Sequence, residues 1–224
     1  MPSLREQRLH AAEYSGGISS APIYQLALSL CQKLQLKGDL LDFGAGKGLL
    51  LQELRRLPYP GAITCADLLP RPDDLPADLR WIQSDLNDPL ALPDHSFDAI
   101  TCTEVIAHLE NPRFVFREFS RLLRPGGVLI LTMPNQESLR AFTALLTGGH
   151  FSAFRGIAYP ALITALLRQD LERICLESGF TPPEFFYTNS GLVPKLHLSW
   201  QQLSFGLLQG RLFSDNFATV TRKI

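Results

Sequence analysis

The sequence lacks the features that would place it in several specialised classes of protein. Its 224 residues contain no run of about 18 uncharged apolar residues, the length that a membrane-spanning helix needs. Charge of one sign does not dominate, because 21 lysines and arginines face 22 aspartates and glutamates. This balance disfavours a large nucleic-acid footprint. The N-terminal stretch is polar and charged where a secretory signal needs an apolar run, so we expect a cytoplasmic protein.

Cysteine is also scarce. The chain has four cysteines, far apart and each inside an apolar segment: Cys31, Cys65, Cys102 and Cys175. This spacing indicates neither a zinc site nor a disulfide framework, and we expect buried core thiols. The length suits one well-buried core, so we expect a single domain over residues 1–224.

Apolar runs alternate with amphipathic ones, which is typical of an α/β protein whose parallel sheet is covered by helices on both faces. A helix should begin near Ser20, with Pro22 in its first turn. A second should begin at Asn111 and end at 124–127, where Arg-Pro-Gly-Gly interrupts the pattern. Strands are expected at 39–43, 62–66, 81–84, 97–103 and 128–133.

The stretch Asp42-Phe43-Gly44-Ala45-Gly46-Lys47-Gly48 falls where the first strand should turn into a helix starting near Lys47. A glycine-rich turn at the carboxyl end of a parallel strand is where nucleotide-like ligands bind in open α/β sheets. A dinucleotide fold has Gly-x-Gly-x-x-Gly, but here the third glycine comes one residue early. Asp42 would repel a phosphate and attract a cation. The alternative is a tight turn without a ligand.

These residues resemble the first motif of the class I S-adenosylmethionine-dependent methyltransferases, and in particular the group of ubiquinone-biosynthesis O-methyltransferases. The resemblance implies a Rossmann-like, doubly wound, mostly parallel seven-stranded sheet, in which "DNFATVTRK" forms an antiparallel last strand. It implies S-adenosyl-L-methionine as the cofactor. It also implies that the cofactor lies against Asp42 and the turn residues Gly44, Ala45, Gly46 and Gly48.

Further cofactor contacts follow from the same resemblance. Asp67, with Leu68 after it, stands where the family binds the ribose hydroxyls. Asp85 and Leu86 stand where it meets the adenine amino group, and Thr103 and Glu104 would close the pocket. The alternatives are a helix cap or solvated acid for Asp67 and a turn residue for Asp85.

The catalytic candidates are Glu104 and His108, which are four residues apart and are expected to share one helix face. His108 is the preferred general base. In related O-methyltransferases and small-RNA ribose methyltransferases the comparable stretch often reads Glu-x-x-Glu-His and can bind a divalent metal. Here Ala107 replaces the second glutamate, so we expect no metal. The alternative is that Glu104 only closes the pocket and that His108 caps or packs.

The acceptor should be specified by lid-like segments near 1–20, 145–166 and 190–212, which carry aromatics and few acids. This composition favours O-methylation of a small or lipid-linked molecule. The segments could instead complete the core, form a homodimer interface or contact a membrane peripherally. Two other functions stay open, a non-catalytic cofactor-binding subunit and an RNA ribose methyltransferase. The net charge of -1 and Ala107 argue against the second.

Overall fold

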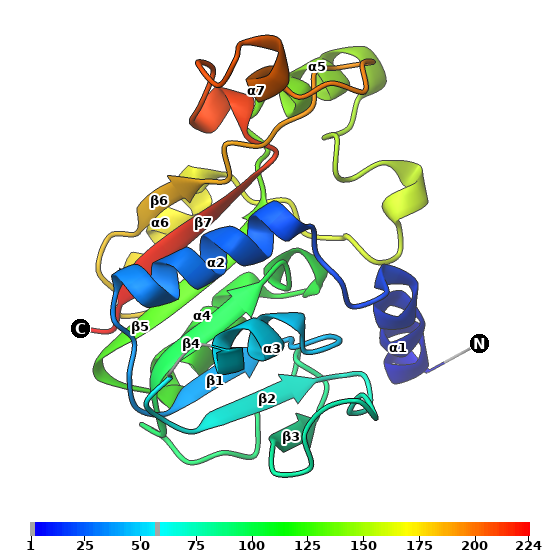
Figure 1. Cartoon of the computed structure of the whole chain (residues 1–224). Helices are drawn as coiled ribbons and strands as arrows, with labels where there is room; N and C mark the ends of the chain where they lie inside the picture. The colour runs from blue at the N-terminus through cyan, green and yellow to red at the C-terminus, as the bar shows by residue number, and fades with distance from the viewer. Residues whose placement is uncertain (1–2, 57–58) are drawn as a thin grey trace.

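The computed structural model describes residues 3–56 and 59–224. Within these residues the strands form one seven-stranded sheet in the order β3-β2-β1-β4-β5-β7-β6 (Figure 1). All neighbours pair in parallel except β7, which runs antiparallel to β5 and β6. The strands are β1 (Leu40–Phe43), β2 (Ile63–Asp67), β3 (Arg80–Gln83), β4 (Phe97–Thr103), β5 (Leu123–Pro134), β6 (Glu184–Tyr187) and β7 (Asn216–Arg222). The predicted α/β fold with an antiparallel last strand is confirmed.

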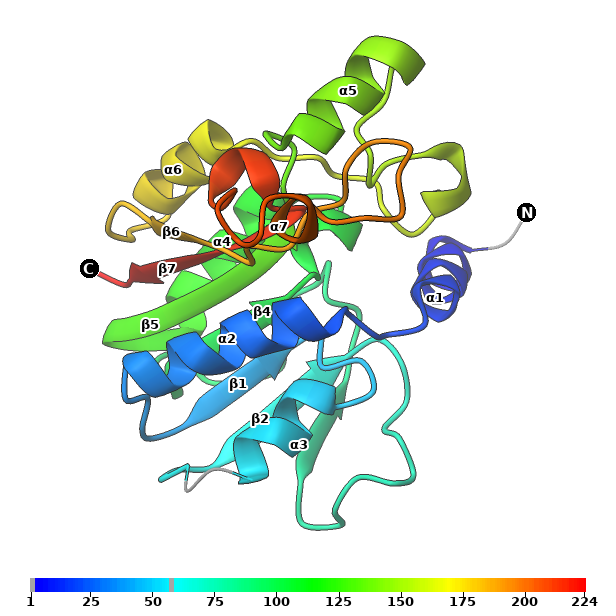
Figure 2. The same cartoon turned by 45° about the horizontal axis from the view of Figure 1, so that its top comes forward.

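Helices cover both faces of the sheet. The α-helices of the described residues are α1 (Leu4–Ser15), α2 (Ala21–Lys33), α3 (Leu49–Arg56), α4 (Pro112–Leu122), α5 (Leu139–Gly148), α6 (Arg168–Glu177) and the short α7 (Trp200–Leu203). Helices α2 and α3 lie on one face, and α4 and α6 lie on the other (Figures 1 and 2). Helix α1 stands away from both layers, beyond the carboxyl ends of the first strands (Figure 2).

The helix starts follow the sequence signals. Ser20 is the N-cap residue of α2, although its side chain makes no capping hydrogen bond, and Pro22 lies in the first turn. The Asn111 side chain accepts a hydrogen bond from the backbone N–H of Phe114 at the start of α4. These are the residues that the sequence predicted for the two boundaries.

Two predicted boundaries are wrong. Helix α4 ends at Leu122, and residues 124–127 belong to β5 instead of closing the helix, because β5 already pairs with β4 at Leu123. Helix α3 begins at Leu49, later than the predicted start near Lys47. The alternating glycines of the preceding turn all have positive φ, which is incompatible with a right-handed helix there.

The core consists of separate apolar layers on the two faces of the sheet. One layer joins β1, β4 and β5 to α4 and α6, and its centre is the Phe119 ring, packed edge-on against Phe43 with 4.9 Å between centroids. The other joins the sheet to α2 and α3 through Ala27, Leu30 and Leu54. Strand β1 is buried along its whole length, so the turn that follows it is rigidly placed. Cys31, Cys65, Cys102 and Cys175 are free and buried, as predicted, and burial raises their pKa values.

The upper end of the molecule in Figure 1 carries α5, α7 and their connecting loops. Several large apolar side chains are exposed there, and the most exposed is Phe205, at 97%. No helix in the described part of the chain is long and apolar enough to cross a membrane. The peripheral membrane contact and the homodimer stay predictions.

We expect Phe119→Ala to lower the free energy of unfolding by about 3 to 5 kcal/mol, because it removes a buried ring and leaves a cavity between α4 and the sheet. Urea unfolding followed by circular dichroism measures the change. The matched control is Phe205→Ala at the exposed position, which should stay within about 0.5 kcal/mol of wild type. A loss below 1 kcal/mol for Phe119→Ala would contradict this packing.

Candidate active site

Two glycines of the turn between β1 and α3 have no room for a side chain. A Cβ atom on Gly44 would lie 2.1 Å from Cγ2 of Val105, and one on Gly46 would lie 2.4 Å from the carbonyl oxygen of Gly17. Both glycines also have positive φ, 79° and 54°, which L-residues rarely adopt. The backbone N–H of Lys47 donates a hydrogen bond to the Gly17 carbonyl. The glycines therefore allow other parts of the chain to contact the turn backbone directly.

Asp67, at the end of β2, holds this turn in place through a hydrogen bond to its backbone. Its Oδ2 accepts a hydrogen bond of 2.7 Å from the Gly46 N–H, and its Oδ1 accepts one of 2.8 Å from the Leu69 N–H. Burial raises the pKa of Asp67, and these N–H groups oppose that shift. The structure therefore gives Asp67 a role in shaping the turn that the sequence did not predict.

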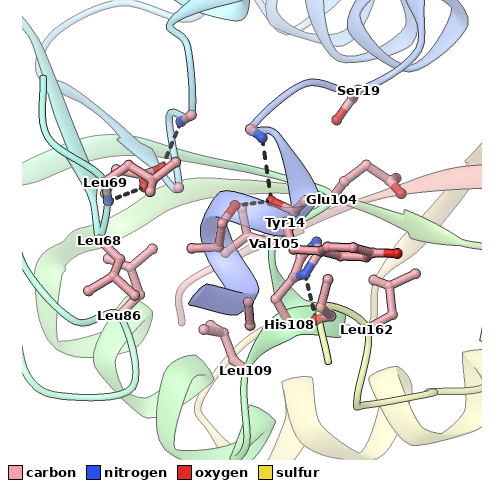
Figure 3. Close-up of a pocket in the computed structure, with 18 of the residues that line it drawn as sticks. Tyr14, Ser19, Leu68, Leu69, Leu86, Glu104, Val105, His108, Leu109 and Leu162 are labelled. Carbon is pink, nitrogen blue, oxygen red and sulfur yellow. Dashed lines mark hydrogen bonds between the residues drawn. The ribbon is translucent and has the colours of Figure 1, made fainter. Parts of the chain in front are cut away.

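A cavity of about 720 Å³ opens beside the turn, at the carboxyl ends of β1, β2 and β4 (Figure 3). It brings together most of the residues predicted to bind the cofactor or act in catalysis: Asp42, Gly44, Ala45, Gly46, Asp67, Leu68, Asp85, Leu86, Thr103, Glu104 and His108. Gly48 is not among the lining residues. It instead packs against Leu75, whose Cδ2 would lie 2.8 Å from an added Cβ.

Two buried carboxylate oxygens in the cavity wall have no hydrogen-bond partner in the described structure. Asp42 accepts a bond of 2.9 Å from the Thr101 hydroxyl through Oδ1, and its Oδ2 is unpaired. Glu104 accepts a bond of 3.0 Å from the Asn216 amide through Oε2, and its Oε1 is unpaired. Burial raises the pKa of each carboxyl group to about 7. Unpaired buried acceptors suit a ligand that brings positive charge or hydrogen-bond donors.

Glu104 and His108 meet at the cavity, but they do not lie on one helix face as predicted. His108 ends a short 3-10 turn, Ile106–His108, and Glu104 precedes that turn with a φ of 61°. The ring Nδ1 of His108 lies 2.7 Å from the carbonyl oxygen of Ala161, to which it donates in the neutral tautomer. Burial lowers the pKa of His108, so the ring is neutral at pH 7.

Helix α1 closes one side of the cavity. Arg8 pairs with Asp85 at 2.8 Å and with Glu110 at 2.8 Å, and the Tyr14 hydroxyl donates to the carbonyl oxygen of Ile157. No residue of α1 is buried, so these polar contacts hold much of the helix in place. Asp85 is therefore engaged by Arg8 and by Asn87, and its predicted contact with adenine remains a prediction.

Another wall of the cavity is the segment 158–163, which hydrogen bonds attach to the 3-10 turn beneath it. The N–H groups of Ile163 and Thr164 both donate to the carbonyl oxygen of Ala107, next to His108. Residues 190–212 contribute no side chain to the cavity lining in the described structure. The described residues also contain no group of three or more His, Cys, Asp or Glu side chains that could hold a metal ion.

Comparison with known proteins decides the family. The family described as "Methyltransferase domain" matches residues 20–183, which is most of the chain. The chain belongs to the methyltransferase domain family. This assignment confirms the family resemblance inferred from the sequence and the predicted cofactor, S-adenosylmethionine.

Among curated methyltransferases, the ubiquinone biosynthesis O-methyltransferase of Xanthomonas oryzae pv. oryzae is 33% identical over 157 residues. The match covers 61% of this chain and 63% of the relative, so it spans less than two thirds of the relative's length.

Solved structures agree on the fold. A putative methyltransferase solved in complex with the Haloferax volcanii Trm112 methyltransferase activator has a TM-score of 0.67 at 17% identity, covering 98% of this chain and 97% of that one. The Burkholderia thailandensis 1,6-didemethyltoxoflavin-N1-methyltransferase, solved with S-adenosylhomocysteine, has a TM-score of 0.60 at 16% identity, covering 100% and 92%.

Arg8, Tyr14 and Asn216 are site residues that the sequence reasoning missed. Each lies far along the chain from the partner that it contacts, and none belongs to a recognisable motif. The polar spacing within "LREQRLHAAEYS" indicates only a solvated helix.

We expect Gly46→Ala to weaken binding of S-adenosylhomocysteine at least about 10-fold, because the new Cβ would collide with the Gly17 carbonyl and displace the turn. Isothermal titration calorimetry measures the affinity. Gly126→Ala is the matched control, since Gly126 also has positive φ, 76°, but an added Cβ there meets nothing within 4 Å. If both variants bind as tightly as wild type, the turn does not form the ligand site.

Proposed function

We propose that this protein is an S-adenosylmethionine-dependent O-methyltransferase that acts on a hydroxyl group of a small or lipid-linked molecule. The observation that supports this most is the cavity itself. It joins the glycine turn and the buried Asp42 and Asp67 to an apolar wall, and Glu104 and His108 also line it. The curated relatives named as ubiquinone biosynthesis O-methyltransferases support oxygen as the methylated atom.

The residues present fit the cofactor. The glycine turn provides bare backbone where any side chain would intrude, and the unpaired Oδ2 of Asp42 provides an acceptor for a cationic group. Asp67 would hold the ribose hydroxyls, and Asp85 with Leu86 would meet the adenine. When bound, the cofactor supplies a methyl group on a positively charged sulfur. The acids of the cavity complement that charge.

The acceptor end of the cavity is apolar. Ala158, Tyr159, Ala161, Leu162 and Ile163 line it, and the Tyr14 side chain reaches it from α1. Arg8 is the one arginine or lysine among the lining residues in the described structure, and it is already paired with two carboxylates. A strongly anionic acceptor would therefore find no free positive charge there. A neutral hydroxyl compound fits better.

The chain supplies positioning and a proton acceptor. Helix α1 and the 158–163 wall flank the cavity and would shield bound reactants from water, and holding reactants in line is worth about 7 to 11 kcal/mol of barrier. Neutral His108 offers one proton acceptor, and Glu104, whose pKa is raised by burial to about 7, offers another. A general base adds about 10² to 10⁴ in rate for an oxygen acceptor.

The test is methyl transfer from S-adenosylmethionine labelled in the methyl group. Purified protein is incubated with simple catechols, such as 4-methylcatechol, and separately with small-molecule, lipid and RNA fractions of a cell extract. We expect label in the catechols or in the small-molecule or lipid fraction, with mass spectrometry showing a gain of one methyl group on oxygen. Label in RNA would support the ribose methyltransferase instead. Tight cofactor binding with no transfer to any fraction would indicate a non-catalytic subunit.

Turnover should not need a divalent metal. Ala107 removes one carboxylate, and Glu104 with His108 alone makes a poor site for a hard cation. The rate of label transfer should therefore persist in excess EDTA. Loss of activity in EDTA that added magnesium restores would contradict this expectation.

A further inference from the structure

A contact between Glu104 and Asn216 joins two distant parts of the chain at the cavity. The residues are 112 positions apart, and the Nδ2 of Asn216 donates a hydrogen bond of 3.0 Å to Oε2 of Glu104. Both residues line the cavity. Asn216 is the first residue of β7, the antiparallel strand inserted between β5 and β6. The contact therefore depends on the complete sheet.

The backbone of Glu104 is fixed in an uncommon conformation. Its φ is 61°, and its N–H donates to both the carbonyl oxygen of Thr132, at 3.1 Å, and the Thr132 hydroxyl, at 3.0 Å. A left-handed backbone at a residue other than glycine costs free energy and persists only where its surroundings enforce it. Here β5 enforces it. The consequence is a carboxylate at the cavity with Oε1 buried and unpaired in the described structure.

Asn216 is held as firmly as Glu104. It pairs with Pro134 of β5, and its carbonyl oxygen accepts hydrogen bonds from the N–H and the hydroxyl of Thr188. The buried Asn135 fixes the approach to β7 by donating to the Ser214 carbonyl. A fixed amide that binds only Oε2 leaves Oε1 as the free oxygen.

We propose that Glu104 takes the proton from the acceptor hydroxyl through Oε1, and that Asn216 is the positioning residue that holds the carboxylate for this step. The proposal rests on the O-methyltransferase function proposed above. In this step the acceptor O–H bond breaks, the proton bonds to Oε1, and the electron pair stays on the acceptor oxygen. That oxygen is then the nucleophile for the methyl group.

His108 donates through Nδ1 to the Ala161 carbonyl, which leaves its Nε2 as the other candidate proton acceptor, and the rate of Glu104→Gln decides between the two residues. The bond to Ala161 ties the 3-10 turn to the 158–163 wall, so His108 shapes the acceptor end of the cavity. In the proposed arrangement the histidine holds the wall and the glutamate moves the proton.

The groups around Glu104 set the direction of its titration. Thr132 faces it from β5, Asn216 from β7, the Cys102 thiol from β4, and His108 from the 3-10 turn. Burial raises the pKa of Glu104 to about 7, and the Thr132 and Asn216 side chains oppose that shift. Because the base must be ionised, the rate should rise with pH through this value. Losing the Asn216 donor should move the pKa further upward.

The experiment follows Glu104 directly by NMR on protein labelled with [δ-¹³C]glutamate. The Glu104→Gln variant assigns its signal. We expect this carboxyl group to titrate near pH 7 in the wild type and about one unit higher in Asn216→Leu, which keeps the side-chain size and removes the donor. Thr188→Val is the matched control. It removes a hydrogen bond to the Asn216 carbonyl without touching Glu104, and it should leave the titration unchanged.

The same variants are then compared as enzymes, with 4-methylcatechol or the acceptor found in the extract screen. Glu104→Gln should lower kcat by about 10² to 10⁴. Asn216→Leu should shift the acidic limb of the pH–rate profile to higher pH, by the same amount as the Glu104 midpoint measured by NMR.

The inference is overturned if Glu104 titrates at the ordinary value of a glutamate, if Asn216→Leu leaves its midpoint unchanged, or if Glu104→Gln keeps the full rate. The NMR result needs no acceptor, so the two proposals can fail separately. If Glu104 titrates as expected in every variant but no acceptor is methylated, the proposed function is refuted, and with it the role of Glu104 in proton transfer. The Asn216 contact with Glu104 would still stand.

Discussion

The absence of side chains at Gly44 and Gly46 is the constraint on which the site depends. A Cβ at Gly46 would strike the Gly17 backbone, and one at Gly44 would strike Val105, the residue next to Glu104. The turn thereby places the link between α1 and α2, the end of β4 and the Asp67 carboxylate around one point. Backbone approaches this close are available only to glycine, so the cavity is set by packing before any ligand binds.

The second consequence of that geometry is electrostatic. Asp42, Asp67 and Glu104 are drawn to the carboxyl edge of the sheet, and burial raises the pKa of each. A buried carboxylate is unfavourable in an empty cavity and favourable beside a positive charge. The three acids therefore suit a sulfonium ligand better than the phosphates that usually lie at such turns. Arg8, the one arginine or lysine that lines the cavity in the described structure, is already paired with Asp85 and Glu110.

Local signals in the sequence were enough to predict the fold and to single out residues that gather beside the glycine turn. The cap at Ser20, the strand at 97–103 and the motif from Asp42 to Gly48 depend on neighbouring residues, and each fell close to its predicted place. The features that the sequence did not predict depend on contacts between residues far apart in the chain. Glu104 and His108 were expected on one helix, but the Thr132 contact forces a left-handed residue and a 3-10 turn. No periodicity indicates that Asn216 would reach Glu104 across the sheet.

Calorimetric titration of the purified wild-type chain with S-adenosylmethionine, repeated in the presence of NAD, tests the central claim most directly. The glycine spacing and the buried acids predict one molecule of S-adenosylmethionine bound per chain, with an affinity that excess NAD does not change. No measurable binding of S-adenosylmethionine, or its displacement by NAD, would contradict the account.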